Sequence, residues 1–463
     1  MNLKSRAAYA VFVLGAMGTA FGAGYGAHAN RFPSQWRWPA DASPTAPLTR
    51  TADGNVMVAA ATADSKTPRV YKPDLRPYET LDEVRRAIKE NFVSTKVDDV
   101  QITNGAIRGM LRSLGDRFTR YLPPDDYTEF LSSNKGEFTG IGARIDVQDD
   151  YAGSAQAKPF GASRPYIVEP IPGGPAEKAG LKRGDVILAV NGKSTADMSE
   201  DATVSFIRGT QGTPVSLKIE RKLNNAKALR DIKYNTFDIQ LTRDTIELNP
   251  VTLNWLPGNI AWMKLDEFNE KTDVEIGNAL KQIKAGQDGA SARGIIFDMR
   301  GNPGGLLTAA VDVGSRFISK GPIVFQRERN GEVRPLNAEP DKFMNLKVPI
   351  VVLVDGYSAS AAEIVTGALK DDSAATVVGA QTFGKASVQV LVDLKNGGAL
   401  VITTAKYLTP AKNDISDKGI MPDVVVAASP EDGASGRGAQ LQKAVDVIKS
   451  KLAVPGTMTA RAN

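Results

Sequence analysis

The sequence contains no cysteine and only one histidine, His28, among its 463 residues. Without cysteine, the chain forms no disulfide, binds no metal through thiolates and has no cysteine nucleophile. His28 lies in an N-terminal segment that has the features of an export signal. If that segment is removed, no histidine remains, which excludes a Ser-His-Asp triad and histidine-rich metal sites. We therefore expect no metal site, and any serine nucleophile needs a base other than histidine.

The sequence also lacks a strong charge imbalance. Its composition, 42% hydrophobic and 24% charged, is ordinary for a soluble globular protein. The formal net charge is +5, and Lys4 and Arg6 of the leader supply two of these charges, so the rest of the chain is only mildly basic. No basic stretch is interleaved with aromatic residues, as single-strand binding requires. We expect no nucleic-acid partner. A chain of this length is expected to form two or three domains.

The N-terminus predicts the compartment. Residues 1–6 form a short basic region, residues 7–24 an uncharged apolar run, and Ala27-His28-Ala29 fits a signal-peptide cleavage site. Residues 7–27 are also about long enough to span a bilayer, so residues 1–29 are either a cleaved signal peptide or an anchor. We expect a protein of the periplasm or cell envelope, with anchoring to the inner membrane left open. Residues 30–75, rich in Pro, Ala, Thr and Ser, read as a disordered linker.

Residues 76–135 form a helical region. Apolar residues recur at helical spacing in two runs: Leu81, Val84, Ile88 and Phe92, then Ile102, Ile107, Met110 and Leu111. This pattern predicts two amphipathic helices, suited to an arm or to a contact between two copies of the chain. A homo-oligomer is therefore one expectation.

Residues 136–222 contain short strand candidates with a period of two, separated by Gly and Pro clusters. One short helix, residues 176–179, ends at Gly180. The series Gly140-Ile141-Gly142, PAEKAGLKRGD at 175–185 and NG at 191–192 resembles a PDZ domain. The resemblance implies that Gly140, Ile141 and Gly142 bind the C-terminal carboxylate of a polypeptide that adds as a strand to a sheet edge. The alternative is that these glycines only form turns in a small β domain.

From residue 223 to 426, continuous apolar strands alternate with helices. Strands are expected at 259–268, 292–301, 348–356 and 376–383, and helices at 274–286 and 362–370. Such strands are typical of a sheet covered by helices on its faces. The fold class is therefore α/β and α+β multidomain: a helical N-terminal arm, a PDZ β domain, a mixed α/β core and a C-terminal tail at 427–463.

One segment of the core resembles a motif of nucleotide-binding proteins, which are a different class. Residues 379–386, GAQTFGKA, nearly match the phosphate loop GxxxxGK[ST]. Ala386 stands where a hydroxyl should bind magnesium, and the following residues alternate like a strand rather than opening a helix. The pattern therefore disfavours an NTPase.

The same loop offers a base for a serine nucleophile. Residues 355–364, DGYSASAAEI, place Ser358 and Ser360 among small residues before a helix. Lys385 could accept a serine proton only if its pKa fell far below the ordinary value near 10.4. Burial among apolar side chains lowers a lysine pKa by several units. Local chemistry alone does not choose between the two serines. Ser360 and Glu363 also form a capping-box pattern, so the Ser360 hydroxyl could simply cap the helix.

Several motifs together resemble the carboxy-terminal processing proteases, the tail-specific Ser/Lys peptidase family. They are SASAAEI at 358–364, TFGKASVQ at 382–389, GIIFDMRGNPGGLL at 294–307, TTAKYLTP at 403–410 and GIMPDVVV at 419–426. The helical segment at 105–122 resembles the N-terminal arm of that family. Two departures are Ala362, where the family often has serine, and GDR near residue 115 in place of a DPxS-like turn.

The resemblance assigns roles to individual residues. It implies that Ser360 is the nucleophile, Lys385 the general base and Gln389 the residue that orients the lysine. The oxyanion hole would be the amide of Ala361 with that of Gly304 or Gly305. Asp371 corresponds to an acidic position sometimes counted with the active site, although it could equally be an exposed carboxylate at a helix end.

The function expected from the resemblance is that of an exported serine endopeptidase. It would cleave polypeptides near their C-termini without a metal or other cofactor, and its PDZ domain would recognise substrate ends or gate activity. The alternative is a non-catalytic PDZ scaffold built on a protease-like fold.

Overall fold

The structure is a computed structural model that describes residues 48–50, 56–58, 77–149, 151, 153–154, 161–224, 232–429, 432 and 438–453. The predicted signal peptide or anchor, and nearly all of the predicted linker, lie outside the described residues. In the part that is described, no helix is both long and apolar enough to cross a membrane. The chain divides into two compact units, residues 16–110 and residues 111–463.

The first unit carries the two predicted amphipathic helices, α1 (Pro77–Asn91) and α2 (Asp99–Arg112). Strands β1 (Leu48–Arg50) and β2 (Val56–Val58) form an antiparallel pair in the same unit. Asp99, in the first turn of α2, forms ion pairs with Arg85 and Lys89 of α1. Both helices form where the sequence predicts them.

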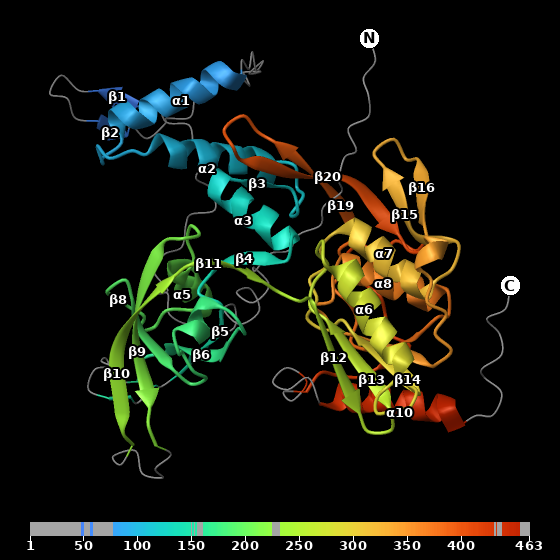
Figure 1. Ribbon diagram of the computed structural model, residues 1–463. Coiled ribbons are helices and arrows are strands. Elements are labelled where there is room, and N and C mark those ends of the chain that lie inside the picture. The colour runs from blue at the N-terminus through green and yellow to red at the C-terminus, as the bar shows by residue number, and fades with distance from the viewer. Residues whose placement is uncertain are drawn as a thin grey trace. The chain divides into compact units, whose positions relative to one another are not determined.

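The larger unit begins with β3 (Arg120–Leu122) and α3 (Pro124–Asn134), followed by the strand pair β4 (Glu137–Gly140) and β11 (Asp244–Glu247). The chain segment that connects β4 to β11 forms a separate sheet (Figure 1). Its strand order is β10-β9-β7-β6-β5, and β8 pairs with β7. Its strands are β5 (Ala143–Gln148), β6 (Arg164–Pro170), β7 (Val186–Val190), β8 (Lys193–Ser194), β9 (Pro214–Lys222) and β10 (Tyr234–Thr242). Its helices are α4 (Pro175–Lys178) and α5 (Glu200–Ile207).

Strands form at residues 136–222, where the sequence predicts the short strands of a PDZ domain. The sheet also extends past residue 222, the expected end of that domain. Strand β10 pairs with β9 along its whole length, so the sheet reaches Thr242. Strand β5 lies at the end of the sheet order, and no strand among the described residues pairs with its outer edge, which is called the open edge below. The hydrophobic core of this domain contains Ile141, which lies between Gly140 and Gly142, together with Ile167 of β6 and Ile207 of α5.

The remaining chain forms a six-stranded sheet in the order β12-β13-β14-β17-β18-β21. Only β12 is antiparallel to its neighbour. The strands are β12 (Val251–Leu256), β13 (Ile260–Leu265), β14 (Gly294–Asp298), β17 (Ile350–Val354), β18 (Thr376–Gly379) and β21 (Val424–Val425). Because β14 and β17 are buried on both faces, their sequences are continuously apolar.

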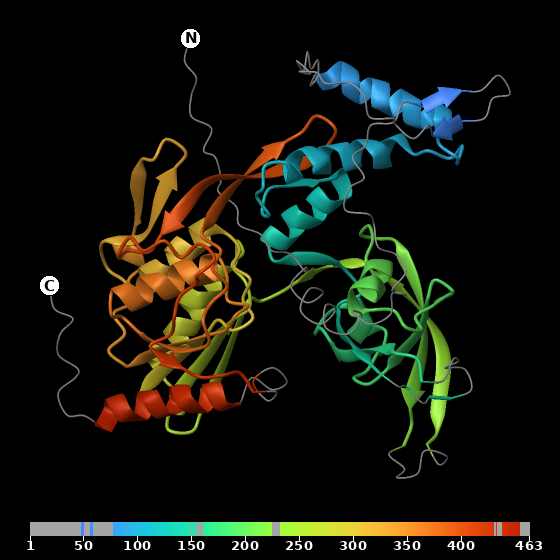
Figure 2. The same cartoon turned by 180° about the vertical axis from the view of Figure 1, so that it is seen from behind.

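Helices cover both faces of this sheet. On one face, alternate strand residues pack with α6 (Thr272–Ala285), α7 (Leu307–Phe317) and α8 (Ala361–Asp371). On the other face they pack with Leu441, Ala444 and Ile448 of α10 (Ala439–Ala453), which lies along the sheet in Figures 1 and 2. The segment expected to be a C-terminal tail therefore contributes a helix to the core.

A second sheet, in the order β16-β15-β20-β19, completes the core, and β3 pairs with β20. Its strands are β15 (Pro322–Glu328), β16 (Val333–Asn337), β19 (Ser387–Asp393) and β20 (Ala399–Leu408), and a 3₁₀ turn, η3 (Pro340–Lys342), follows β16. The alternating sequence after Lys385 is thus a strand, β19, as predicted. No helix follows GAQTFGKA, which agrees with the argument against a phosphate loop.

Candidate active site

Ser360 lies at the turn between the buried strand β17 and helix α8, as the N-cap residue of that helix. Its backbone has φ 57° and ψ −116°, a conformation that a residue with a Cβ rarely adopts. Such a conformation costs on the order of 1–3 kcal/mol and persists only where the surroundings impose it, often at functional sites. The turn therefore holds Ser360 in a strained position at the positive end of α8.

The two candidate serines differ in what their hydroxyl groups do. The Ser358 hydroxyl donates to the Met299 carbonyl at 2.8 Å and accepts the Asp355 N–H at 3.0 Å. Ser360 Oγ is also fully buried, but it forms no hydrogen bond with any residue that the structure describes. An unsatisfied buried hydroxyl costs about 1–3 kcal/mol. Ser358 thus has a structural role. Ser360 and Glu363 have the arrangement of a capping box, but the Ser360 hydroxyl forms no hydrogen bond within the criteria met by the Ser358 hydroxyl and is therefore available.

Glu363 of α8 joins the Ser360 turn to the loop that carries Lys385. Its Oε2 accepts the N–H groups of Ser360 and Lys385, both at 2.9 Å. Its Oε1 accepts the Gly384 N–H and the Thr382 hydroxyl, both at 2.6 Å. Burial raises the pKa of Glu363, and these four hydrogen bonds oppose the rise. The capping-box pattern pointed to Glu363, but its contacts with residues 382–385 could not be read from the sequence.

A second bridge joins the same two backbones. The hydroxyl of Tyr407, on β20, contacts the carbonyl oxygens of Ser360, at 3.1 Å, and of Lys385. The Tyr407 side chain is buried in the core. Ser360 and Lys385, 25 residues apart in the sequence, are thus held together at both their N–H and their C=O groups.

Lys385 lies in the loop between β18 and β19 with only 1% of its surface exposed. Burial, together with the positive charge of Arg120, lowers the pKa of Lys385 to about 7, against the opposing effects of Glu363 and Asp116. The Phe118 ring lies close to the amine, with its centroid 5.1 Å from Nζ. A large fraction of Lys385 is therefore neutral near pH 7, the state in which a lysine can accept a proton.

The other two polar candidates lie in different surroundings. Gln389, on β19, is buried, and its amide donates to Ser387 Oγ at 2.8 Å and Thr403 Oγ1 at 3.2 Å. Asp371 is exposed at the C-terminal end of α8, where it accepts the Ala411 N–H at 2.9 Å. At about 1.5 Å per residue, the length of α8 separates Asp371 from Ser360 by roughly 15 Å. The structure therefore does not bring Asp371 to Ser360 and Lys385.

The backbone amides beside Ser360 distinguish the two candidate glycines. The Gly304 N–H donates to Asn302 Oδ1 at 2.8 Å. In the described part of the chain, the N–H groups of Gly305 and Ala361 donate no hydrogen bond. A Cβ at Gly304 would lie 2.7 Å from the Ser360 Cβ, so only glycine fits there. Gly305 and Ala361 are thus the amides free to bind an oxyanion, and Gly304 permits the close approach.

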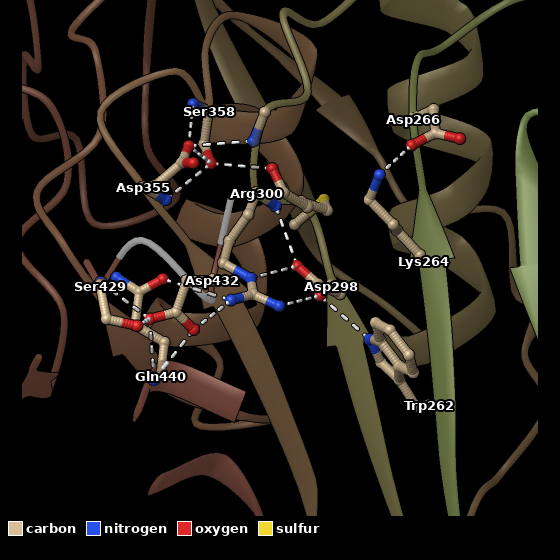
Figure 3. Close-up of polar contacts among 12 residues, drawn as sticks. Trp262, Lys264, Asp266, Asp298, Arg300, Asp355, Ser358, Ser429, Asp432 and Gln440 are labelled. Atoms are coloured by element: carbon tan, nitrogen blue, oxygen red, sulfur yellow. Dashed lines mark hydrogen bonds and ion pairs between the residues drawn. The ribbon is translucent and has the colours of Figure 1, made fainter. Parts of the chain in front are cut away.

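The half-buried Asp355 (Figure 3) holds the loop at residues 301–305, called the glycine loop below, against the serine turn at residues 355–360. The Asp355 carboxylate accepts the N–H groups of Gly301, Tyr357 and Ser358, each at 3.0 Å. Because Gly301 belongs to the glycine loop and the other two to the serine turn, Asp355 fixes one segment against the other. Asp355 is not among the site residues that the sequence predicts, although its place directly after the buried strand β17 is a signal for one.

An ion network connects the same loop to the C-terminal region. Arg300 pairs with Asp298 at 2.6 Å and with Asp432 at 2.9 Å, and its guanidinium also donates to Gln440 of α10 (Figure 3). The Trp262 indole N–H donates to Asp298 Oδ2 at 3.0 Å, the oxygen that also pairs with Arg300. The sequence predicts FDMRG as a motif, but Asp432 and Gln440, which lie more than 130 residues from Arg300, leave no local signal.

The segment Gly140-Ile141-Gly142, expected to bind a carboxylate, lies where β4 ends and β5 begins. The carbonyls of Ile141 and Gly142 accept hydrogen bonds from Ala176 and Ile171, at 2.7 and 2.9 Å. The N–H groups of Ile141 and Gly142 donate none to any described residue. Two unpaired amides thus lie at the beginning of β5, the strand with the open edge.

Among the residues that the structure describes, no cluster of three or more His, Asp or Glu side chains could hold a metal ion.

Three family models match the chain. The model for Peptidase family S41 matches residues 259–426, that for a PDZ domain matches 166–221, and one described as the activating protease CtpB N-terminal domain matches 50–126. A crystal structure described as an S41 protease from Bacteroides fragilis NCTC 9343 has the same fold, with a TM-score of 0.50 and 16% identity over 82% of this chain and 98% of the other. The chain is thus a serine-type peptidase of family S41 with a PDZ domain.

Curated relatives define the family more narrowly. The carboxy-terminal-processing protease of Bartonella bacilliformis is 37% identical over 330 residues, which are 71% of this chain and 70% of the relative. The carboxy-terminal processing protease CtpA of Bacillus subtilis (strain 168) is 34% identical over 366 residues, 79% of this chain and 70% of the relative. The chain belongs to the carboxy-terminal processing proteases.

Proposed function

We propose that this protein is an endopeptidase in which Ser360 is the nucleophile and Lys385 the general base. The observation that carries the proposal is at Ser360, whose buried hydroxyl has no hydrogen-bond partner among the described residues. The nearby amides of Gly305 and Ala361 are likewise unpaired in that part of the chain, and Glu363 joins the Ser360 backbone to that of Lys385, a buried lysine whose pKa is lowered to about 7. A serine at a helix N-terminus with an adjacent base and free amides is the arrangement that acyl transfer requires.

In the proposed reaction, the neutral amine of Lys385 takes the proton from Ser360 Oγ as the oxygen attacks the scissile carbonyl carbon. The amides of Gly305 and Ala361 stabilise the oxyanion that forms. Lys385, now an ammonium, gives its proton to the departing amine, and an acyl-enzyme remains on Ser360. Water, activated by the neutral lysine, then hydrolyses the ester. The Ser360–Lys385 hydrogen bond must form on substrate binding, and such bonds often tighten only in the complex.

A fluorophosphonate probe tests the nucleophile, because it phosphonylates activated serines. The full chain should be labelled at Ser360 and should cleave a denatured protein substrate. Ser360→Ala should abolish both labelling and cleavage. Ser358→Ala is the matched control: it removes the hydrogen bond to Met299 and should lower stability while labelling persists. Labelling that survives in Ser360→Ala, or cleavage by neither the wild type nor any variant, would contradict the proposal and favour a non-catalytic scaffold.

We also propose that the PDZ domain captures the C-terminal carboxylate of the substrate. The unpaired amides of Ile141 and Gly142 support this role, because converging backbone N–H groups bind anions. The open edge of β5 can accept the rest of the peptide as an added strand. Amidating the substrate C-terminus removes the negative charge, so cleavage of the amidated form should be markedly slower. Equal rates for the acid and the amide would refute carboxylate capture but would leave the Ser360 reaction untouched.

Export is a third part of the proposal, supported by the apolar run at 7–27 and the cleavage pattern at Ala27-His28-Ala29. The protein should be recovered from the periplasmic or membrane fraction, with an N-terminus at or near Asn30 if the signal is cleaved. Recovery from the cytoplasm with Met1 or Asn2 at its N-terminus would contradict export.

A further inference from the structure

The turn at residues 116–119 is tightly held next to Lys385. The Asp116 carboxylate accepts the N–H of Phe118 at 3.1 Å and both the N–H and the hydroxyl of Thr119, at 3.1 and 2.5 Å. The Thr119 hydroxyl in turn accepts the Thr403 N–H of β20 at 3.1 Å. Four hydrogen bonds thus fix the position of Phe118, whose backbone lies between those of Asp116 and Thr119.

The fixed turn places the Phe118 ring against the amine of Lys385, 5.1 Å from ring centroid to Nζ. A second cation, the Arg117 guanidinium, lies 4.8 Å from the same centroid and pairs with Asp417 at 2.8 Å. Residues 116–119 belong to the segment matched by the N-terminal family model, 50–126, and lie far outside the peptidase match at 259–426. The surroundings of Lys385 are therefore completed by a segment from outside the peptidase match.

We propose that Phe118 is a positioning residue that closes off the Lys385 amine from water and so keeps it neutral at working pH. This role rests on the proposed function of Lys385 as the general base. It means that residues 116–119 take part in catalysis through the lysine, without touching the substrate.

The ring has two opposite effects on the lysine, and the experiment must separate them. By excluding water, the ring disfavours the ammonium and lowers the pKa of Lys385. By presenting an aromatic face, it favours the ammonium and raises that pKa. The proposal requires the first effect to win, in agreement with burial as the main cause of the lowered pKa. The charged groups that face the amine, Arg120 on β3, Asp116 in the turn and Glu363 on α8, stay the same in every variant below.

Two substitutions distinguish the effects. Phe118→Ser admits water to the amine and removes the aromatic face, whereas Phe118→Leu keeps an apolar cover and removes only the aromatic face. The full chain and both variants are compared by the pH dependence of kcat on a peptide substrate. The rate of inactivation by a fluorophosphonate, measured over the same pH range, reports the state of the base without requiring peptide binding.

In the wild type, activity should rise with pH around a midpoint near 7, because the ammonium loses its proton there. Phe118→Ser should move the midpoint up by about one pH unit, so that kcat at pH 6.5 falls about eightfold and recovers above about pH 9. KM should stay unchanged. Phe118→Leu should leave the midpoint in place or move it slightly down. A merely structural role would lower kcat at every pH without moving the midpoint.

Three results would overturn the proposal. They are an unmoved midpoint in a folded Phe118→Ser enzyme, a downward move in that variant, and an upward move of the same size in Phe118→Leu. If the serine variant does not fold, the leucine variant still decides, because an upward move there contradicts shielding by apolar bulk. Failure of the underlying function looks different: the wild type itself would then show no rise in activity around pH 7.

Discussion

Replacing Lys385 by methionine should make the protein more stable while it destroys activity. Methionine keeps the length of the side chain and removes the group that is costly to bury. The folded-state pKa of Lys385, about 7, lies below its ordinary value of 10.5, so the folded protein binds the proton more weakly than the unfolded chain. The lysine therefore destabilises the fold fully below about pH 7, less as the pH rises, and not at all above about pH 10.5.

The size of the effect follows from the same two values. The difference between 10.5 and about 7 corresponds to about 5 kcal/mol. Between pH 7 and 8 the Lys385→Met variant should therefore gain a few kcal/mol in its free energy of unfolding, about 3 kcal/mol at pH 8. This gain should shrink steadily toward pH 10.5. A lysine kept at such a cost is retained for activity rather than for stability.

Urea unfolding at pH 7, 8 and 10.5 measures the effect, followed by tryptophan fluorescence, to which the buried Trp262 of β13 contributes. Lys406→Met, at an exposed position on the neighbouring strand β20, is the matched control and should change stability little at any pH. A Lys385→Met protein that is less stable than the wild type, or whose gain does not depend on pH, would refute the argument that burial lowers the lysine pKa.

Two further predictions concern the surroundings of Ser360. Gly305→Ala should lower kcat by about 10²–10³-fold, because its Cβ would lie 1.9 Å from the Phe268 carbonyl and displace an amide of the oxyanion hole. Gly356→Ala, whose Cβ would lie 3.9 Å from the Gln381 carbonyl oxygen, an ordinary contact distance, should retain most activity, and equal losses in the two would contradict the assignment. Asp432→Ala should cost about 1.5–3 kcal/mol in the free energy of unfolding, because it removes one of the two carboxylates that pair with the buried Arg300 and leaves only Asp298. Thermal unfolding checks this, with the exposed Asp446→Asn as the neutral control.

Much of the fold could be predicted from residue periodicity. The apolar runs at 294–297 and 350–354 lie in β14 and β17, because strands buried on both faces need no alternation of polar and apolar residues. The C-terminal helix was missed, although Leu441, Ala444 and Ile448 have helical spacing. These residues pack against the face of the six-stranded sheet that α6, α7 and α8 do not cover. The sequence does not show that this face needs a helix from the C-terminal region.

The candidate site divides in the same way. The sequence motifs predict Ser360 and Lys385 as site residues. The structure distinguishes Ser360 from Ser358 by the hydrogen bond that Ser358 donates to Met299, which lies 59 residues earlier in the chain. The choice between Gly304 and Gly305 needs the side chain of Asn302, which occupies the Gly304 amide. Both distinctions depend on where a hydroxyl or an N–H group points in the folded chain. The spacing of residues along the sequence does not predict this orientation.

The position of Phe118 could not be predicted at all. The turn at 116–119 departs from the pattern expected at that point, and its contact with Lys385 spans 267 residues. The sequence shows that Asp116 and Thr119 are able to stabilise a turn. The hydrogen bond from Thr403 of β20 to Thr119, which fixes this turn beside Lys385, forms only in the folded chain.

The most direct test of the account is the activity of Lys385→Arg. Arginine keeps the positive charge and the approximate length of lysine but cannot be deprotonated in proteins. If Lys385 is the general base, the folded variant should be as inactive as Ser360→Ala, at least the roughly 10²–10⁴-fold typical of a lost base, while it still binds peptide through the PDZ domain. A folded Lys385→Arg enzyme that retains about a tenth of wild-type turnover would contradict the Ser360/Lys385 mechanism.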